Sequence, residues 1–513
     1  MNSDNQKITN ILIVDRMKGL SEKIIDALSS DFHINNSVVV CGEDVGCHVT
    51  KHIDLRGLSP FGVFECLNED NAPLDSDLIN KMSPFDSMIM ASIDQLEKPF
   101  MQMRFRKAKY SRDNKIPFLD TFEFTYHERK QIYNNLLIFC NNILKTYSIN
   151  LLVYTAPPFT PLDLVLYFCC KCMSIKTVVT HQISYISRVI FSEDMFIPSD
   201  MIRQRLLQLQ AEHSGREEDI QLSEVTEKYL SKMAMQKPAT PWFMSLKGYG
   251  FGYYSISLRS VFSDLVFGLV NSLKNISNWK QFMVHFKLTS SYLRKKHKIE
   301  KYLDAISESP DLQKKFFYFP LHMQPEASAL PACDIFNDQY LPIQILSKLL
   351  PADTYIYVKE HLAQPAITRT YSFFRDLSDL KNVRIISKTT STFDLIQNSV
   401  AVITGTGTAG IEALFYNKPV IYFGSTVFEA FPGAFRVRTT RDFELAVRSI
   451  LNGDTLSVDL QQIRLFYKAL EDCSCPGFVG ALNNTSIDHC LDNKATLQFI
   501  PHKLLKYLQQ SSV

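Results

Sequence analysis

The sequence has no excess charge of either sign. Its 513 residues carry 55 Lys and Arg against 53 Asp and Glu, which gives a formal net charge of +2. A chain that binds nucleic acid or an anionic membrane over its whole surface carries a large positive excess. Any anion that this protein binds must therefore be held by a local site.

Long apolar runs and an export signal are also missing. Met1–Lys7 is polar and leads directly into the apolar Ile11–Val14, without the basic and apolar segments of a secretory signal. The most apolar stretches, Leu162–Met173 and Val261–Leu273, each contain a charged residue and are shorter than the roughly 20 residues that cross a bilayer. We therefore expect a cytoplasmic protein without a transmembrane helix.

The eleven cysteines do not form a pattern that indicates disulfides or a metal site. In a long chain without an export signal, reduced thiols are expected. Cys169, Cys170 and Cys172 lie in an apolar run with no histidine at ligand spacing, which favours burial over metal binding. Cys473 and Cys475 are too isolated to indicate a zinc site. We expect neither a bound metal nor a cofactor.

Length and composition predict two domains. A single hydrophobic core stops growing near roughly 250–300 residues, and 46% of this chain is hydrophobic. In the first third, short apolar runs alternate with helical patterns, which is typical of a parallel sheet with crossover helices. The runs are Ile11–Val14, Ser37–Cys41, Ser87–Met90, Asn150–Tyr154 and Lys176–Thr180, with a helix predicted at Asp163–Met173.

The same alternation returns after a helical middle segment. Pro198–Gln236 and Ser257–Ser307 have helical spacing. Strands are then predicted at Phe316–Pro320, Thr354–Val358, Val383–Ile386, Val400–Ile403 and Val420–Phe423, and helices at Gln339–Leu350, Thr370–Leu380, Thr392–Asn398 and Ala409–Tyr416. We predict an α/β chain with an N-terminal domain over residues 1–190, a helical insertion over 191–310, a C-terminal domain over 311–453 and a tail over 454–513. The last helix of the tail, near Pro501–Gln510, is expected to pack back on the domains.

Polar residues follow the predicted strands of the C-terminal domain. In a doubly wound sheet, ligands bind at the carboxyl ends of the strands. The loop Thr404–Gly410 is small and opens a helix, so its backbone can approach a phosphate while the helix N-terminus supplies N–H groups and positive dipole. The candidates for binding a nucleotide with one or two phosphates are Gln324, Lys359, His361, Thr404, Gly405, Thr406, Gly407, Thr408, Gly410 and Glu412, the last of which could accept ribose hydroxyls.

Each of these signals also has a structural interpretation. The Thr404–Gly410 loop does not have the spacing of a P-loop and could be a structural turn. His322 could be a core histidine, Glu326 could cap a helix, and Lys359–Glu360 could be a solvated charge pair. Because three polar strand ends come together at one edge of the sheet, we favour a binding site over these structural interpretations.

At these residues the sequence resembles the bacterial capsule and lipopolysaccharide biosynthesis glycosyltransferases, which include Kdo transferases and are distantly similar to UDP-N-acetylglucosamine 2-epimerases. The resemblance is carried by Tyr318–Ser328, Val358–His361, Thr406–Leu414 and Lys418–Gly424, although Leu362 stands where the family has proline after the histidine. The resemblance implies a GT-B fold of two facing Rossmann-like domains. It also implies that the C-terminal domain holds the donor and the N-terminal domain the acceptor, without an obligatory metal.

Catalytic residues are harder to predict than binding residues. Glycosyl transfer needs cationic and N–H groups at the leaving phosphate and, at the acceptor hydroxyl, a base. Glu326, His322 and Asp15 are the catalytic candidates, and His181 or Arg188 could orient the acceptor. The resemblance favours a CMP-activated keto-sugar such as CMP-Kdo as donor, with a UDP-sugar as the alternative. The partners expected are this donor and a glycan or glycolipid acceptor, but no nucleic acid.

Two other functions remain open at this stage. A UDP-sugar 2-epimerase would act without an acceptor, but the insertion at Pro198–Ser307 makes the chain long for that class. A non-catalytic glycan-binding or assembly protein would retain a decayed nucleotide site. The basic stretch Arg294–Lys298 is interpreted as a solvated helix face or as a contact for an acidic glycan or for the anionic surface of the inner membrane.

Overall fold

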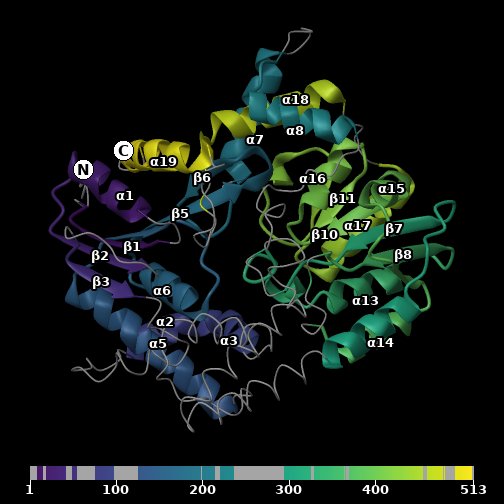
Figure 1. Ribbon diagram of the computed structural model, residues 1–513, viewed down its shortest axis with the longest axis horizontal. Coiled ribbons are helices and arrows are strands. Elements are labelled where there is room, and N and C mark those ends of the chain that lie inside the picture. The colour runs from purple at the N-terminus through teal and green to yellow at the C-terminus, as the bar shows by residue number, and fades with distance from the viewer. Residues whose placement is uncertain are drawn as a thin grey trace, which may run out of the picture.

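The computed structural model describes residues 8–15, 19–41, 49–54, 76–96, 125–197, 199–213, 220–235, 294–324, 328–362, 364, 369–454, 459–477, 479 and 491–510. These residues form two α/β units, which lie on opposite sides of Figure 1 and are joined by helices along one edge. The predicted fold class, two facing Rossmann-like doubly wound domains of the GT-B type with a helical segment between them, is confirmed.

The N-terminal domain is built on a seven-stranded sheet in the order β13-β6-β5-β4-β1-β2-β3. Strands β1 to β5 pair in parallel, whereas β6 is antiparallel to β5 and β13 is antiparallel to β6. The strands are β1 Asn10–Val14, β2 Asn36–Cys41, β3 Lys51–Asp54, β4 Leu151–Tyr154, β5 Lys176–Ile183, β6 Arg188–Ser192 and β13 Cys475–Pro476. The strand order changes direction between β1 and β4.

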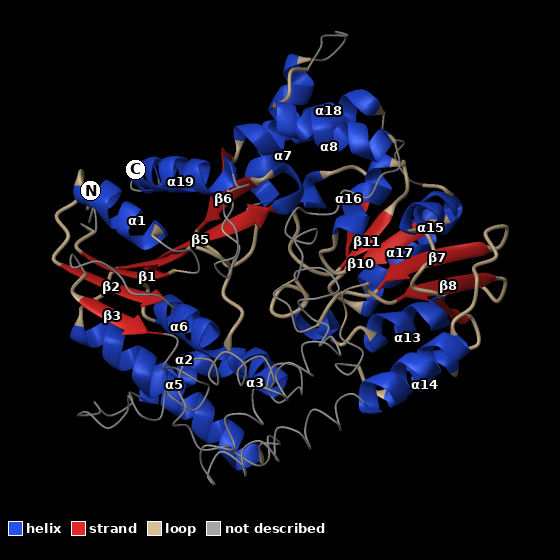
Figure 2. Cartoon of the chain, in the orientation of Figure 1, coloured by secondary structure: helices blue, strands red, loops and turns tan. Residues whose placement is uncertain are grey.

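Helices cover both faces of this sheet, as Figure 2 shows. They are α1 Leu20–Ser29, α2 Ser76–Met82, α3 Asp86–Leu96, α5 Tyr126–Thr146 and α6 Pro161–Cys172. The short apolar run Ser87–Met90 does not add a strand to the sheet, because these residues lie in α3. Ile89 and Ile93 recur at helical spacing and are fully buried, so the run is part of a helical stripe.

The C-terminal domain has a six-stranded sheet in the order β9-β8-β7-β10-β11-β12, with every pair parallel. The strands are β7 Lys315–Pro320, β8 Thr354–Lys359, β9 Val383–Ile386, β10 Ala401–Thr404, β11 Val420–Tyr422 and β12 Ala434–Arg436. Phe316 and Tyr318 pack on one face of the sheet, and Phe317 and Phe319 pack on the other. This strand order changes direction between β7 and β10, which is where doubly wound sheets bind ligands.

The helices of this domain are α13 Tyr340–Leu349, α14 Tyr371–Ser378, α15 Thr392–Asn398, α16 Thr408–Phe415 and α17 Thr440–Asn452. Four of them match the helices predicted in the sequence to within a few residues. Threonine and serine N-caps start α14, α15 and α17, so these boundaries follow from local hydrogen bonding.

Three further helices join the domains: α7 Ser199–Glu212, α8 Glu224–Ala234 and α18 Leu460–Asp472. They lie side by side above β6 and α16 in Figure 1 and belong to one hydrophobic core that reaches from the end of β5 to the C-terminal sheet. Residues 294–306 are helical, and the rest of the predicted helical stretch before them lies outside the described residues. Within the described part of the chain, no helix is long and apolar enough to cross a membrane.

The last helix, α19 Leu491–Gln510, crosses back to the N-terminal domain and packs against α1. Its buried Ile500, Leu504 and Leu508 share a core with Leu20 and Ile24. The helix starts ten residues before the predicted start, and Pro501 lies inside it.

Candidate functional site

The carboxyl ends of β7 and β10 lie next to each other at the point where the C-terminal sheet reverses its strand order. The segment after β7 carries His322 and Gln324, and the segment after β10 carries Gly405, Thr406 and Gly407. The predicted site therefore gathers at one edge of the sheet. Lys359 is the last residue of the neighbouring strand β8, and His361 follows this strand.

The His322 ring connects these two strand ends. Its Nε2 accepts hydrogen bonds from the backbone N–H groups of Gly405 at 2.9 Å and Thr406 at 3.3 Å. The hydroxyl of Thr404 lies 2.9 Å from the same nitrogen and itself accepts from the Gly407 N–H at 3.2 Å. Because Nε2 is an acceptor, the neutral ring carries its proton on Nδ1 and the Thr404 hydroxyl donates to Nε2.

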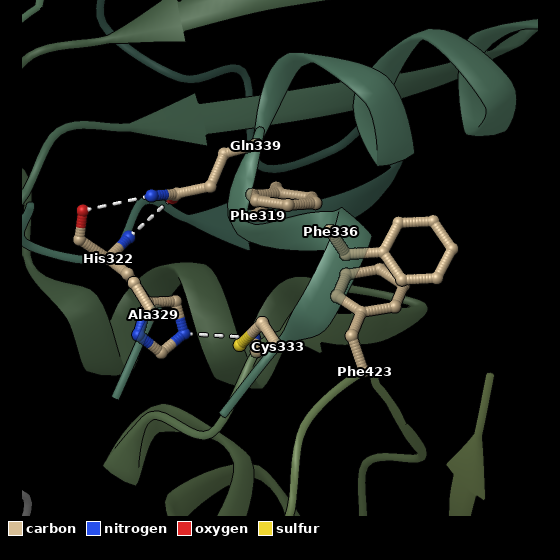
Figure 3. Close-up of a pocket in the computed structure, with 8 residues that line it drawn as sticks. Phe319, His322, Ala329, Cys333, Phe336, Gln339 and Phe423 are labelled. Carbon is tan, nitrogen blue, oxygen red and sulfur yellow. Dashed lines mark hydrogen bonds between the residues drawn. The ribbon is translucent and has the colours of Figure 1, made fainter. Parts of the chain in front are cut away.

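His322 is buried and has little room for a ligand. Figure 3 shows Cys333 beside the ring and Gln339 hydrogen-bonded to the backbone of His322. The cavity that these residues line has a volume of only about 10 Å³. Burial lowers the pKa of His322 from 6.5 to about 3, with the nearby His361 and Arg369 as smaller causes. The arrangement makes His322 a neutral acceptor that fixes the Gly405–Gly407 loop.

Close packing explains the glycines of the loop. A Cβ on Gly405 would lie 2.4 Å from the Cys333 sulfur, and one on Gly407 would lie 2.9 Å from Thr404 Oγ1. A Cβ on Gly410 would lie 2.5 Å from the ring of Phe428. We had expected these small residues to let a ligand approach the loop. In the structure they let the loop pack closely against other side chains of the protein.

The N-terminus of α16 remains open toward solvent. Gly407 is its N-cap and provides no side-chain capping bond, while Thr408 at the first helical position is exposed. The Thr406 hydroxyl donates to the Ser328 carbonyl at 2.8 Å, so it is held by the protein. Backbone N–H groups at such a helix start, together with the dipole, form an anion-binding position.

Lys359 is buried and Glu412 is half-buried, and these two groups of opposite charge do not form an ion pair. The Lys359 ammonium donates to the Thr390 carbonyl at 2.5 Å and to the Thr392 hydroxyl at 2.9 Å. Burial lowers its pKa to about 8, although Glu412 opposes this shift. Burial raises the pKa of Glu412 to about 7, with Lys359 opposing it. Within the described chain the Glu412 carboxylate has no hydrogen bond, so both groups retain binding capacity.

A buried network holds the strand-end segments together. Arg369 Nε contacts Glu360 Oε2 at 2.6 Å, and both side chains are only 3% exposed. Arg369 also donates to the His322 carbonyl at 2.5 Å and to Gln324 Oε1 at 3.3 Å. The Gln324 amide donates to the Asn337 carbonyl at 2.6 Å. The interpretation of Lys359–Glu360 as a solvated pair is therefore wrong, because both residues are buried and Glu360 pairs with Arg369.

Lys388, which follows the end of β9, is a cation near the site that was not predicted from the sequence. Lys359 pairs with Ile386 in the β8–β9 register, so His361 and Lys388 follow at equivalent positions. Burial lowers the pKa of His361, Glu360 opposes this shift, and Lys388 is among the cations that add to it. Lys388 could have been found by extending the strand-end rule to Val383–Ile386, whereas Arg369 gave no signal in the sequence.

The catalytic candidates differ in where they lie. Glu326 is outside the described residues. Asp15, at the end of β1, accepts from the Ser21 N–H at 2.8 Å at the start of α1 and from the Thr155 hydroxyl at 3.3 Å at the end of β4. It therefore links the two strands at the reversal of the N-terminal sheet, as His322 does in the other domain.

The two residues proposed to orient an acceptor are held by the protein. The ring of His181 lies 3.2 Å from the Asp194 carbonyl, and burial lowers its pKa to about 4. Arg188 binds the end of α18, donating to the Glu471 carbonyl at 2.8 Å and to the Ser474 hydroxyl at 2.7 Å. Arg188 thus connects the N-terminal sheet to the joining helices.

Among the described residues, no group of three His, Cys, Asp or Glu side chains could hold a metal ion. The eight cysteines that the structure describes, including Cys169, Cys170 and Cys172, are free thiols. Burial raises the pKa of Cys333, beside Gly405, to about 12, so this thiol stays protonated at neutral pH.

The chain is similar to several solved structures, at low sequence identity. A Thermosulfurimonas dismutans KpsC, described as a beta Kdo 2,7 transferase, is 11% identical, and the match covers 76% of this chain and 98% of that one with a TM-score of 0.31. The Methanocaldococcus jannaschii UDP-GlcNAc 2-epimerase in complex with UDP-GlcNAc and UDP is 12% identical, with coverage of 86% and 92% and a TM-score of 0.24. The Neisseria meningitidis UDP-GlcNAc 2-epimerase bound to UDP-GlcNAc is 12% identical, with coverage of 91% and 99% and a TM-score of 0.23. TM-scores this low carry no inference about chemistry.

Comparison of the sequence with protein families is more specific than comparison with solved structures. No functionally curated protein matches it significantly. Residues 284–452, which contain every strand of the C-terminal sheet and all of the helices from α13 to α17, match the family described as capsule polysaccharide biosynthesis protein. The match relates residues 284–452, and not the whole chain, to the capsule polysaccharide biosynthesis family.

Proposed function

We propose that this protein is a glycosyltransferase that moves a sugar from a nucleotide-activated donor to a growing surface polysaccharide. The family of the C-terminal domain supports a role in capsule polysaccharide biosynthesis. The observation that carries the proposal is the group at the strand ends, where the buried Lys359 and the half-buried Glu412 do not pair with each other beside the open N-terminus of α16. This arrangement suits a ligand that carries both phosphate and hydroxyl groups.

In the proposed complex, the donor phosphate lies at the N-terminus of α16, near Thr408. Lys359, His361 and Lys388 supply cationic or N–H groups, which stabilise the negative charge that develops as the nucleotide leaves. Glu412 accepts hydrogen bonds from the ribose hydroxyls. A carboxylate with a pKa of about 7 is a suitable acceptor there, because the ligand hydroxyls replace the water that burial has removed.

Several predicted site residues take a positioning role in this proposal. His322 and Thr404 hold the Gly405–Gly407 loop, and Gln324 belongs to the Arg369 network beneath it. Asp15 holds the start of α1 in the other domain. Glu326 remains the proposed catalytic base. His322 is not proposed as the base, because its Nε2 already accepts hydrogen bonds from two backbone N–H groups.

Our choice of donor rests on the resemblance to the Kdo transferases. A CMP-activated keto-sugar carries one phosphate, which a single helix N-terminus with neighbouring cations can accommodate, and we keep it ahead of a UDP-sugar. We also propose that the reaction needs no metal. Activity that survives treatment with EDTA is the expected result.

We further propose that the protein works in the cytoplasm, peripherally attached to the inner membrane. Arg294, Lys295 and Lys298 are exposed on the helix over residues 294–306, while Lys296 lies 3.8 Å from Glu300. Co-sedimentation with vesicles that contain anionic lipid should weaken when the three exposed residues are replaced by serine. Unchanged co-sedimentation would exclude this attachment.

A thermal-shift panel tests the proposed function. CMP, CDP, UDP, GDP and available nucleotide-sugars are each added to the native protein, to Lys359→Met and to His361→Ala. Lys348→Met, on the exposed face of α13, is the matched control. A ligand that binds the folded state raises the melting temperature. We expect one base to stabilise the native protein and the control but not the two site variants. No shift with any nucleotide would favour a non-catalytic glycan-binding protein.

Turnover then separates a transferase from an epimerase. The stabilising nucleotide-sugar is incubated with and without polysaccharide acceptor, and the products are separated by anion-exchange chromatography. A transferase releases nucleotide faster with the acceptor. Conversion of the intact donor to its 2-epimer without an acceptor would identify the epimerase instead.

A further inference from the structure

The segment that follows β7 is held by side chains in the way that a strand is held by its neighbour. The backbone bonds between β7 and β8 continue to the Leu321 N–H, which donates to the Lys359 carbonyl at 2.9 Å. At the next alternate positions, His322 and Gln324, a glutamine side chain bonds both the N–H and the carbonyl. A glutamine amide has a donor and an acceptor side, so it can make the pair of bonds that an adjacent strand makes.

Two buried glutamines from different loops make these bonds. Gln339, the N-cap of α13, accepts from the His322 N–H at 2.7 Å and donates to the His322 carbonyl at 3.2 Å, as Figure 3 shows. Gln364 makes the same pair with Gln324, at 2.7 Å and 3.0 Å. Buried backbone groups cost free energy when they are left unpaired, so both amides stabilise this segment.

Gln364 also holds the loop after β8, which carries His361. Its backbone N–H donates to the His361 carbonyl at 3.0 Å and closes a turn directly after the strand. The His361 N–H is bonded in turn to Glu360 Oε1 at 2.8 Å. Leu362 stands where the related family has proline, a residue that restricts such a turn by its ring. In this chain, a hydrogen bond from Gln364 closes the turn, and the same residue ties it to the segment after β7.

The charge state of His361 reports where its ring lies. Its pKa is lowered, and burial is the largest cause. A ring that moved toward solvent would lose this burial, so its pKa would rise toward the value of about 6.5 that solvated histidines have. The titratable groups that act on the ring are Glu360, which opposes the shift, and Arg369, Lys388, Lys359 and the neutral His322.

We propose that Gln364 is a positioning residue of the donor site, which holds His361 in place for the donor phosphate. The inference rests on the proposed glycosyltransferase function, because that function gives His361 its role at the leaving nucleotide. Gln364 is buried and acts through the backbone of His361 and Gln324. A small displacement of a group that contacts the reacting phosphate has a large effect, which is why such a residue matters.

The test compares Gln364→Met with Gln339→Met in the full-length protein. Each substitution removes two hydrogen bonds between a buried amide and the same backbone segment, so both should lower stability. Gln364 lies in the loop that carries His361, whereas Gln339 lies at the start of α13, which makes it the matched control. Histidine Cε1 is labelled with ¹³C and titrated by NMR between pH 5 and pH 8, and His361→Ala assigns the signal.

We expect the pKa of His361 to rise toward the solvated value in Gln364→Met and to keep its native value in Gln339→Met. A native value in Gln364→Met, or the same rise in both variants, would overturn the proposal. The corresponding asparagine variants keep the amide but shorten its reach. They replace the methionine pair if either of those proteins fails to fold, with the same expected difference.

Nucleotide binding connects the position of His361 with the proposed function. Calorimetry at pH 7.5, where the ring is mostly neutral in both proteins, uses CMP as the probe and UDP as the alternative. Affinity should fall about tenfold in Gln364→Met, the effect of losing one hydrogen bond to a charged group. Equal affinity in the native protein and Gln364→Met would refute the positioning role. A native protein that binds neither nucleotide would instead count against the proposed function, whatever the titration shows about the loop.

Discussion

Replacing His322 by glutamine is expected to make the protein less sensitive to acid. The glutamine carbonyl can accept the Gly405 N–H in place of Nε2, but glutamine does not titrate. In the native protein, burial, with a smaller contribution from His361 and Arg369, keeps the imidazole neutral by lowering its pKa from 6.5 to about 3. The unfolded chain therefore binds a proton as the pH falls below 6.5, whereas the folded chain does not bind it until much lower pH.

The sign and size of the effect follow from this difference. Stability is complete above pH 6.5 and is lost as the pH falls toward 3, by up to about 1.4 kcal/mol for each pH unit. Between pH 7 and pH 5 the loss from His322 alone amounts to about 2 kcal/mol, after allowing for partial protonation of the unfolded chain near 6.5. His181, which burial also keeps neutral, contributes equally to both proteins and cancels in the comparison.

The assay is urea denaturation of the native protein and His322→Gln at pH 7, 6 and 5, followed by tryptophan fluorescence and circular dichroism. The difference in free energy of unfolding between the two proteins should change by about 2 kcal/mol in favour of the variant as the pH falls. A difference that stays constant within about 0.5 kcal/mol, several times smaller than that shift, would refute the assignment of a neutral, backbone-bound imidazole. Long-range nitrogen NMR should in addition report the Nδ1–H tautomer.

Three further changes test other parts of the site. Arg369→Met removes the cation that pairs with the buried Glu360 carboxylate and should lower the free energy of unfolding by about 3–5 kcal/mol in urea, whereas adding Glu360→Leu should restore most of it. A double variant as unstable as the single one would contradict the pairing. Gly405→Ala should lower the free energy of unfolding by about 1–3 kcal/mol in thermal melts, because the added Cβ clashes with the Cys333 sulfur. Adding Cys333→Ala in the same chain should recover at least half of this loss. A double variant as unstable as Gly405→Ala alone would place the strain elsewhere. Nucleotide affinity measured by calorimetry should fall up to about tenfold between pH 7 and pH 9 as the Lys359 ammonium, with its pKa of about 8, loses its proton, whereas the weak residual affinity of Lys359→Met should be the same at both pH values.

The sequence was most informative where one physical pattern dominated. Buried parallel strands such as Phe316–Pro320 are continuous apolar runs, so their ends and the polar residues after them could be located directly. The doubly wound order then brings the ends of β7 and β10 together. That order was enough to predict the edge of the sheet at which Lys359, His361 and the Thr404–Gly410 loop meet.

Contacts between distant segments could not be predicted in the same way. Arg369 reaches Glu360 and the His322 carbonyl because of a loop whose path no periodicity encodes. The Ser87–Met90 run could be a strand or part of a helix, and only packing against Met82 and Ile93 decides for the helix. The antiparallel strands β6 and β13 are short, and β13 has two residues, too few for a period to appear.

Both domains also use a side chain to join the two strands at which their sheets reverse direction. Asp15 and Thr155 connect β1 with β4, and His322 with Thr404 connects β7 with β10. A polar residue that follows a strand at this position can therefore use its hydrogen bonds to hold the two strands together, whether or not it takes part in chemistry. This is why Asp15 and His322 were good candidates for the site and poor candidates for the catalytic base.

The return of α19 to the N-terminal domain has a consequence for how the protein is made. Ile500, Leu504 and Leu508 complete a core with residues of α1 that left the ribosome about 480 residues earlier. At 5–20 residues per second, that apolar surface waits for about half a minute to a minute and a half before its partner helix exists. During synthesis, the first domain to emerge is therefore the last to close, and a chaperone that covers the exposed face of α1 would act in that interval.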